Sequence, residues 1–353
     1  MKKNKKNIGN ILFLLILCGL TFWLLLKDQD LPQIIQCIVE ANKGYLFIGI
    51  LFVIVFVCSE SVIIHYMMHA LNKKTKLYQC IKYSFVGFFF SCITPSATGG
   101  QPAQIYYMNK DGLDIPVSTL VLMIVTIGYK FVLVLIGVFL VIFDQNLIQT
   151  YLEERRILLY IGLLLNVGCI ILMLLLVFWP NLAKRIIMWG MALLEKLHIL
   201  KENSLRKQKL INSMDQYHRA AAFFLEHKLV IFNVAIISIF QRVVLFFVTY
   251  LVYRAFGLNE ANPWLVTMLQ ATISISVDML PLPGGMGISE SLFLADFRPI
   301  FTNQYLLSGL LLSRGISYYS LLFLSAVVTV GAHFILTVRE RKAQKGYRYD
   351  RFL

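Results

Sequence analysis

The chain has 353 residues, of which 58% are hydrophobic and only 15% are charged, and its 33 Lys and Arg against 19 Asp and Glu give a net charge of +14. A soluble domain carries about 25% charged residues, so this composition excludes a water-soluble globule and also a disordered chain. The six cysteines are scattered, mostly in apolar runs, and no Cys-x-x-Cys or Cys/His spacing indicates a metal or redox site. The sequence therefore predicts a polytopic membrane protein.

A helix needs about 20 mostly apolar residues to cross the hydrocarbon core of a bilayer. Six runs meet this requirement: 8–26, 45–70, 117–143, 157–179, 229–253 and about 305–338. The first run follows four lysines and resembles a signal peptide, but no small-residue cleavage site follows it, so we expect an uncleaved first helix. The last run is too long for one straight crossing, and Arg314–Gly315 is a candidate interruption.

The positions of lysine and arginine predict the orientation, because these residues gather on the cytoplasmic side of membrane proteins. Four segments are basic and are predicted to lie inside: the N-terminus, 72–82, 180–228 and 339–353. Three segments have at most two basic residues each and are predicted to lie outside: 27–44, 144–156 and 254–263. Both termini are then cytoplasmic. Most of the positive charge follows from this bias and from attraction to anionic lipid, and nucleic-acid binding is the weaker interpretation.

Two further apolar runs do not fit six simple crossings. Residues 83–93 are too few to cross, and residues 264–280 contain Asp278 and lead directly into Pro-Leu-Pro-Gly-Gly. The topology closes only if each of these runs enters the membrane and returns on the same side.

The two short runs end in related motifs, which indicates an internal repeat. The motifs are TPSATGGQPAQ at 94–104 and PLPGGMGISE at 281–290, and the offset from Gly99 to Gly284 is 185 residues. The long runs that open the halves start at 45 and 229, an offset of 184. Half 1 (45–143) starts outside and half 2 (229–338) starts inside, so the predicted repeat is inverted.

Breaks in a helix are costly inside hydrocarbon, where an unpaired amide or carbonyl costs several kcal/mol unless protein or a wet cavity satisfies it. The paired glycines permit positive φ and close approach, and the prolines prevent the helices from continuing. We expect two hairpin tips that meet near mid-membrane and line a polar cavity; the alternative is two ordinary surface loops. The candidate cavity residues from the motifs are Thr94, Pro95, Ser96, Thr98, Gly99, Gly100, Gln101, Gln104, Pro283, Gly284, Gly285 and Glu290.

Charged side chains inside predicted crossings are further candidates, because each costs at least ~2.5–3.5 kcal/mol at mid-membrane. They are Glu60, Lys130, Arg242, Asp278 and Arg314. The three cations are predicted to neutralise phosphate, and the acids, with Glu290, to pair with a head-group amine or to carry a proton. The alternatives are a structural ion pair between Glu60 and Arg242 and, if the last crossing starts after Gly315, an Arg314 that reaches the membrane surface.

Segment 180–228 mixes apolar and basic residues and is expected to form a basic amphipathic helix on the inner leaflet. No zinc-protease, hydrolase or nucleotide-loop motif occurs in the sequence, so we expect neither a cofactor nor a metal.

The motifs at 94–108 and 281–290 resemble the two signatures of the lysylphosphatidylglycerol synthase transmembrane family, the flippase-like domain of the multiple peptide resistance factor. The resemblance extends from about residue 8 to residue 338. It implies a bacterial cytoplasmic-membrane protein that moves, or helps to make, aminoacylated phosphatidylglycerol, a lipid that protects against cationic peptides. It also implies that residues 94–104 and 281–290 face a head-group cavity.

Full-length synthases of that family add a large cytosolic domain that uses aminoacyl-tRNA, and no such machinery is visible in this sequence. We therefore expect an all-α integral membrane protein with six crossings and two re-entrant hairpins in an inverted repeat. It is expected to bind and translocate a phospholipid, its partner being membrane lipid, with homo-oligomerisation left open. The alternatives are a phosphatidylglycerol lysyltransferase, which would use lysyl-tRNA, and a non-transporting scaffold.

Overall fold

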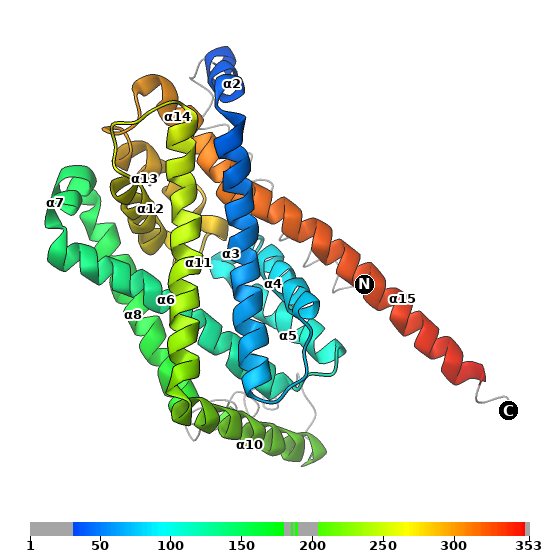
Figure 1. Ribbon diagram of the computed structural model, residues 1–353. Coiled ribbons are helices and arrows are strands. Elements are labelled where there is room, and N and C mark those ends of the chain that lie inside the picture. The colour runs from blue at the N-terminus through cyan, green and yellow to red at the C-terminus, as the bar shows by residue number, and fades with distance from the viewer. Residues whose placement is uncertain (1–30, 180–184, 186–187, 190–203, 350–353) are drawn as a thin grey trace.

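The computed structural model describes residues 31–179, 185, 188–189 and 204–349, and these residues form helices without any β-strand (Figure 1). Five helical segments are long and apolar enough to cross a membrane: Lys43–Ala70, Ile115–Phe143, Gln145–Phe178, Lys228–Ala255 and Asn303–Val338. They match five of the six predicted crossings. The sixth, 8–26, lies outside the described residues, as does most of 180–203.

Half 1 consists of two long helices with a helical hairpin between them. After α2 (Leu31–Glu40), its elements are α3 (Lys43–Ala70), α4 (Leu77–Cys92), the short turn η1 (Pro95–Ala97), α5 (Gly100–Lys110) and α6 (Ile115–Phe143). The side chain of Asn42 caps α3 by accepting a hydrogen bond from the Gly44 amide at 2.9 Å. A proline in the first turn of α6 needs no hydrogen-bond partner there and fixes the start of that helix.

Half 2 repeats this order. Its elements are α11 (Lys228–Ala255), α12 (Pro263–Val277), η4 (Pro283–Gly285), α13 (Ile288–Asp296), α14 (Asn303–Arg314), η5 (Gly315–Ser320) and α15 (Leu321–Tyr349). The halves are joined by α7 (Gln145–Leu147), η2 (Ile148–Leu152), η3 (Glu153–Arg155), α8 (Arg156–Phe178) and α10 (Ser204–Glu226). Asn262 caps α12 as Asn42 caps α3, accepting from the Trp264 amide at 2.9 Å.

The helix boundaries of the two halves agree at the offset of 185 residues. α3 and α11 begin at 43 and 228 and end at 70 and 255, and α4 and α12 end at 92 and 277. α11 packs along α3 and runs in the opposite direction (Figure 1). Gln241 Nε2 on α11 donates to the Phe56 carbonyl on α3 at 3.0 Å, and these two positions are also 185 apart. Residues can contact their own repeat equivalents only beside the axis that relates the halves, so this contact marks that axis.

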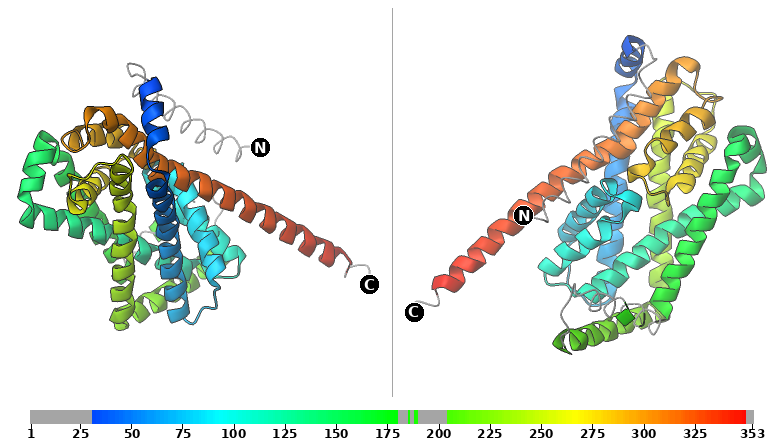
Figure 2. Two further views of the ribbon diagram at one scale, coloured as in Figure 1. Left: turned by 45° about the horizontal axis from the view of Figure 1, so that its top comes forward. Right: turned by 180° about the vertical axis from the view of Figure 1, so that it is seen from behind.

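The two hairpins enter the bundle from opposite ends (Figures 1 and 2). α4 and α5 lie toward the end at which α3 and α8 finish and α10 is packed, whereas α12 and α13 lie toward the other end. Four lysines follow α3 at the first end, namely Lys73, Lys74, Lys76 and Lys82. We call this end the basic face and the other the opposite face. The two halves therefore have inverted orientations.

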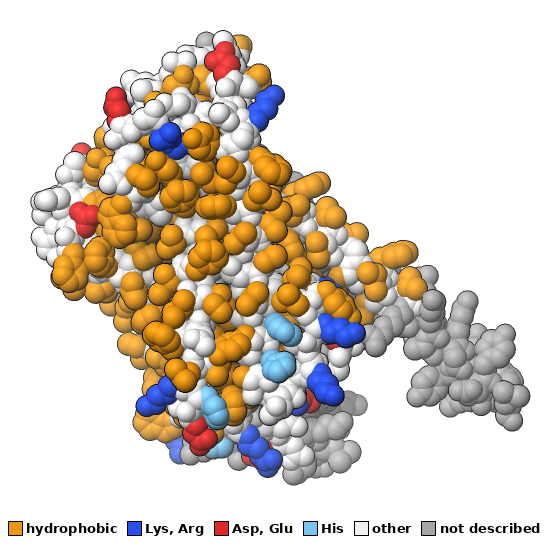
Figure 3. All heavy atoms as spheres, viewed as in Figure 1, with side chains coloured by type: hydrophobic (Ala, Val, Ile, Leu, Met, Phe, Trp, Pro, Cys, Tyr) orange, Lys and Arg blue, Asp and Glu red, His pale blue; other side chains and the backbone are white. Residues whose placement is uncertain are grey.

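The surface agrees with a membrane setting. On the face seen in Figure 3, hydrophobic side chains cover the middle of the molecule and charged side chains gather toward its two ends, and exposed apolar residues occur along the long helices. An apolar belt of this kind is stable only where lipid replaces water around it.

Two boundaries differ from the sequence predictions, and one segment predicted only to lie outside is helical. The first short helix begins at Leu77 and not at residue 83, and the Gln79 side chain accepts from the Lys76 amide at its start at 2.9 Å. Asp111 binds Lys82 Nζ at 2.5 Å and Tyr83 Oη at 2.7 Å in the same helix. Segment 144–156 contains α7, η2 and η3 and the first residue of α8. The last crossing runs from α14 into α15 through a π-helical turn, η5, so Arg314 lies within it and does not precede it.

Close packing of α8 against α12 requires a glycine. A Cβ added to Gly162 would lie 2.8 Å from the Ser276 Cα, whereas a Cβ on Gly168 of the same helix meets nothing within 4 Å. We expect Gly162→Ala to lower the free energy of unfolding by about 1–3 kcal/mol through overpacking. Gly168→Ala is the matched control and should be neutral or stabilising by up to about 1 kcal/mol. Thermal unfolding in detergent measures both, and equal midpoints would contradict this packing.

At the opposite face, Arg155 Nε in η3 binds Asp296 Oδ1 at the end of α13 at 2.7 Å. Burial raises the pKa of Asp296 from 3.8 to about 6, an effect that Arg155 only partly offsets. The folded protein thus holds this proton more tightly than the unfolded chain does. Stability should therefore rise as the pH falls from about 7 to about 4, and Asp296→Asn should remove that component. Melting curves across this range test it; a slope unchanged in Asp296→Asn would be the contrary result.

Candidate functional site

The tips of the two hairpins touch in the interior of the bundle. Ser96 Oγ, in η1, donates to the Leu280 carbonyl beside η4 at 3.2 Å, and the two turns pack on each other. The second tip also reaches Lys130, which lies at the middle of α6. The two broken segments therefore meet about halfway along the long helices.

The two tips achieve their turns differently. In the second tip Gly284, Gly285 and Gly287 have φ of 58°, 65° and 86°. In the first tip Ser96 and Ala97 take the left-handed conformation, with φ of 49° and 54°, and Gly99 does not. Gly99 and Gly100 thus do not use the positive φ that glycine permits. These glycines serve close approach: a Cβ on Gly100 would lie 2.8 Å from the Gly87 carbonyl oxygen.

Two cavities lie on the two sides of the contact between the tips. The basic-side cavity, about 400 Å³, is lined by Glu60 in the second half of α3, by residues of α6 between 122 and 130, and by Cys169 and Met173 in the second half of α8. These positions run from the middle of the long helices toward the basic face. Glutamines of the first hairpin complete its polar wall.

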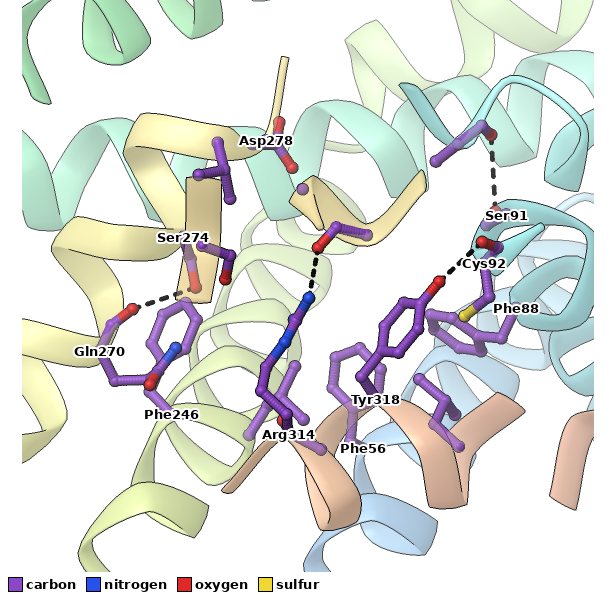
Figure 4. A pocket seen from close by; sticks show the side chains of 18 of the residues that line it. Phe56, Phe88, Ser91, Cys92, Phe246, Gln270, Ser274, Asp278, Arg314 and Tyr318 are labelled. Atoms are coloured by element: carbon purple, nitrogen blue, oxygen red, sulfur yellow. Dashed lines mark hydrogen bonds between the residues drawn. The ribbon is translucent and has the colours of Figure 1, made fainter. Parts of the chain in front are cut away.

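The opposite-side cavity, about 240 Å³, is lined by the second half of α11, by α12, by the second tip and by residues 314–321 (Figure 4). In Figure 4 Gln270 and Ser274 lie on one side of this cavity and Cys92 on the other, with Arg314 and Tyr318 between them. Hydroxyl and amide groups supply most of its polarity, and Thr249 Oγ1 donates to Gln270 Oε1 at 2.9 Å.

The repeat relates the two cavities but gives them different chemistry. Positions 60, 104 and 129 of the basic-side cavity correspond, at the offset of 185, to 245, 289 and 314 of the opposite-side cavity. The equivalents of Glu60 and Tyr129 are Leu245 and Arg314. Glu60 therefore faces only the basic-side cavity. Ser96, Arg242 and Asp278 line both cavities.

Two of the three candidate cations are already neutralised. Lys130 Nζ lies 2.5 Å from Asp278 Oδ2 and 3.2 Å from Asn166 Oδ1, and this lysine is 4% exposed. The ion pair joins the halves, since Lys130 belongs to α6 and Asp278 to the second hairpin.

The second neutralised cation, Arg314, forms its ion pair within half 2. Its Nε binds Glu290 Oε1 at 2.7 Å, and its Nη2 donates to the Gly284 carbonyl at 2.9 Å. The other carboxylate oxygen of Glu290 accepts from the Gly287 amide at 2.6 Å. Arg314 therefore faces the interior and shapes the second tip, which rules out the alternative in which it reaches the membrane surface.

Arg242 is different. Its guanidinium carbon lies 4.3 Å from the ring centre of Tyr129 and 5.5 Å from that of Phe56, and its Nε is buried without a hydrogen-bond partner. The proposed ion pair with Glu60 is not formed, because Glu60 instead accepts from Gln104 Nε2 at 2.8 Å. Within the described segments Arg242 is thus a cation between two aromatic rings, facing both cavities with no carboxylate bound to it.

The predicted residues fall into two groups. Those that line a cavity are Glu60, Ser96, Thr98, Gln101, Gln104, Lys130, Arg242, Asp278, Gly284, Gly285 and Arg314. Those that shape the tips without lining a cavity are Thr94, Pro95, Gly99, Gly100, Pro283 and Glu290. In the described residues no cluster of three His, Cys, Asp or Glu could hold a metal.

Sequence reasoning missed several neutral residues of the site. Tyr129 supports Arg242, Asn166 binds Lys130, and Tyr318 Oη donates to the Cys92 carbonyl at 2.8 Å. Asn166 carried a usable signal, since it is a fully buried amide in an otherwise apolar crossing. Tyr129 and Tyr318 carried none, because tyrosine is ordinary in such helices.

An inverted repeat of broken helices around a polar interior, inside an apolar belt, defines a multi-pass membrane protein. The family model described as lysylphosphatidylglycerol synthase TM region matches residues 10–325, and the chain belongs to that family. This confirms the resemblance carried by the two glycine motifs. None of the curated proteins compared with the chain matches it.

Removal of one partner from the Lys130–Asp278 pair should be costly. Asp278→Asn leaves a buried ammonium without its counter-ion, so we expect a loss of about 3–5 kcal/mol of stability. Asp114→Asn is the control, because its ion pair with Lys73 at 2.6 Å is partly exposed and should contribute less than about 1 kcal/mol. Thermal unfolding measures the stability lost in each variant. Similar losses would show that the buried pair contributes no more to stability than the exposed one.

Proposed function

We propose that this protein binds the head group of a phospholipid between the two hairpin tips and translocates it across the membrane. The observation that supports this function best is Arg242, a half-buried arginine that lines both cavities, binds no carboxylate and has its Nε buried without a hydrogen-bond partner. A charge that binds no carboxylate is costly inside a membrane, so it is by default a candidate for function.

Phosphate is the counter-ion that this site suits. A guanidinium offers a planar set of donors that matches phosphate oxygens in bidentate fashion. Stacking on Tyr129 and Phe56 fixes the plane of the guanidinium, which lowers the entropy lost on binding. Ser91 and Ser96 line both cavities and can donate further hydrogen bonds to the same anion.

The sizes of the cavities agree with a head group as the ligand. Volumes of about 400 Å³ and 240 Å³ accommodate a small polar group, whereas two acyl chains need far more room. The acyl chains would remain in the surrounding lipid while the head group passes through the interior.

The basic-side cavity also favours an amine. Glu60 faces it, held by Gln104, on the same cavity that Arg242 lines. A head group that carries a phosphate and an amine would find an opposite charge for each. Lysylphosphatidylglycerol, the lipid in the family's description, has both, and it is the substrate we propose. Its movement to the outer leaflet would reduce the negative surface charge and so confer resistance to cationic peptides, in a bacterial cytoplasmic membrane.

The test is translocation of a labelled lipid in proteoliposomes. We expect Arg242→Gln to reduce the rate about 10–100-fold, the range for loss of a hydrogen bond to a charged group, and Arg242→Lys to retain part of the activity. Arg254→Gln is the matched control, because Arg254 lies on the same helix but at its exposed end. Equal rates for wild type and Arg242→Gln would refute the proposal.

Added lysyl-tRNA separates this function from the transferase alternative. The purified protein should form no lysyl-lipid from phosphatidylglycerol and lysyl-tRNA, and formation of that product would overturn the assignment. A scaffold would show neither activity.

A further inference from the structure

The two cavities are separated by a row of contacts that crosses the molecule at the level of the tips. At one end Tyr318 Oη donates to the Cys92 carbonyl of the first hairpin at 2.8 Å. In the middle Ser96 Oγ donates to the Leu280 carbonyl at 3.2 Å. At the other end Lys130 binds Asp278 of the second hairpin at 2.5 Å. A head group that moves from one cavity to the other has to pass where at least one of these contacts breaks.

The two end contacts occupy similar, but not identical, positions in the two halves. Tyr318 and Cys92 correspond, at the offset of 185, to positions 133 and 277, which are close to Lys130 and Asp278. Each hairpin tip is therefore fastened to the last long helix of the other half. The middle contact is the place where the two fastened tips face each other across the repeat axis.

The two end contacts are stabilised by more neighbouring interactions than the middle contact. Lys130 is held by a charge-assisted bond, roughly twice as strong as a neutral one, and also by Asn166. The Tyr318 ring lies against the second tip, since a Cβ on Gly284 would be 2.7 Å from its Cζ, and the hydroxyl bond to Cys92 is buried. The tip-to-tip bond, by contrast, joins two neutral groups, is longer and is only part-buried.

The lining residues coincide with the middle contact. Ser96 and Ala97, which form the first tip, line both cavities, and so does Arg242. Arg242 can therefore hold one phosphate from either cavity. An anion that moves past the tips would not have to leave its cation on the way.

We infer that the contact between Ser96 and Leu280 is the gate between the cavities, and that a phosphate head group crosses there while it remains bound to Arg242. The Lys130–Asp278 and Tyr318–Cys92 contacts attach each hairpin to the last long helix of the other half, and they remain formed during passage. This inference rests on the proposed function. It adds the route of the head group and names Ser96 and Leu280 as the residues that separate to let it pass.

Cross-linking the tips tests the gate. In a chain whose six cysteines are replaced by serine, Ser96→Cys/Leu280→Cys is oxidised to a disulfide and later reduced. We expect oxidation to lower lipid translocation in proteoliposomes at least about tenfold and reduction to restore it, since 1.4 kcal/mol of added barrier is already a factor of ten. Lys73→Cys/Asp114→Cys is the control pair at the basic face, where oxidation should change nothing.

A second measurement keeps the gate testable if the protein moves no lipid. Ser317→Cys, in the opposite-side cavity, serves as a reporter for a membrane-impermeant thiol reagent added at the basic face. Before cross-linking the reagent should reach it slowly, and the cross-linked tips should block that reaction. Loss of labelling without any lipid movement would support the gate and reject the proposed function. Unchanged labelling and unchanged translocation after complete cross-linking would overturn the gate.

Discussion

The whole interior of this protein depends on one constraint: within hydrocarbon, charged and broken-backbone groups have to find their partners inside the protein. Lys130 meets Asp278, and Arg314 meets Glu290 and the open carbonyl of Gly284. These contacts neutralise the charges and also stabilise the turn that breaks the second hairpin. Arg242 differs from these two cations because it binds no carboxylate directly, although the charge of Glu60 is near, and it is the group to which we assign phosphate binding.

The inverted repeat explains how two breaks can coexist at one depth. α3 and α11 pack along each other in opposite directions, and each is followed by a hairpin that starts from its own face. Because the halves are related by an axis between these helices, the tips arrive at the same level and each supplies partners for the other. A single broken hairpin would leave its turn against lipid, so each half completes the environment of the other.

Much of this arrangement was predictable from sequence. Runs of apolar residues gave five of the crossings, and the glycine pairs gave the same offset of 185 residues that separates the boundaries of α3 and α11. Contacts between helices were not predictable, since hydropathy says nothing about which way a side chain points. Glu60 and Arg242 lie on neighbouring helices, yet Glu60 binds Gln104 instead. The turn at Ser96–Ala97 was hidden because residues other than glycine seldom take positive φ.

Native mass spectrometry of the purified protein tests the central claim most directly, because it reads the bound lipid without requiring transport. The account predicts that wild-type protein retains a phospholipid through detergent exchange and that Arg242→Gln loses it, while both unfold at similar temperatures. Equal retention of phospholipid by the two proteins would contradict the role of Arg242 and, with it, the interior as a head-group site.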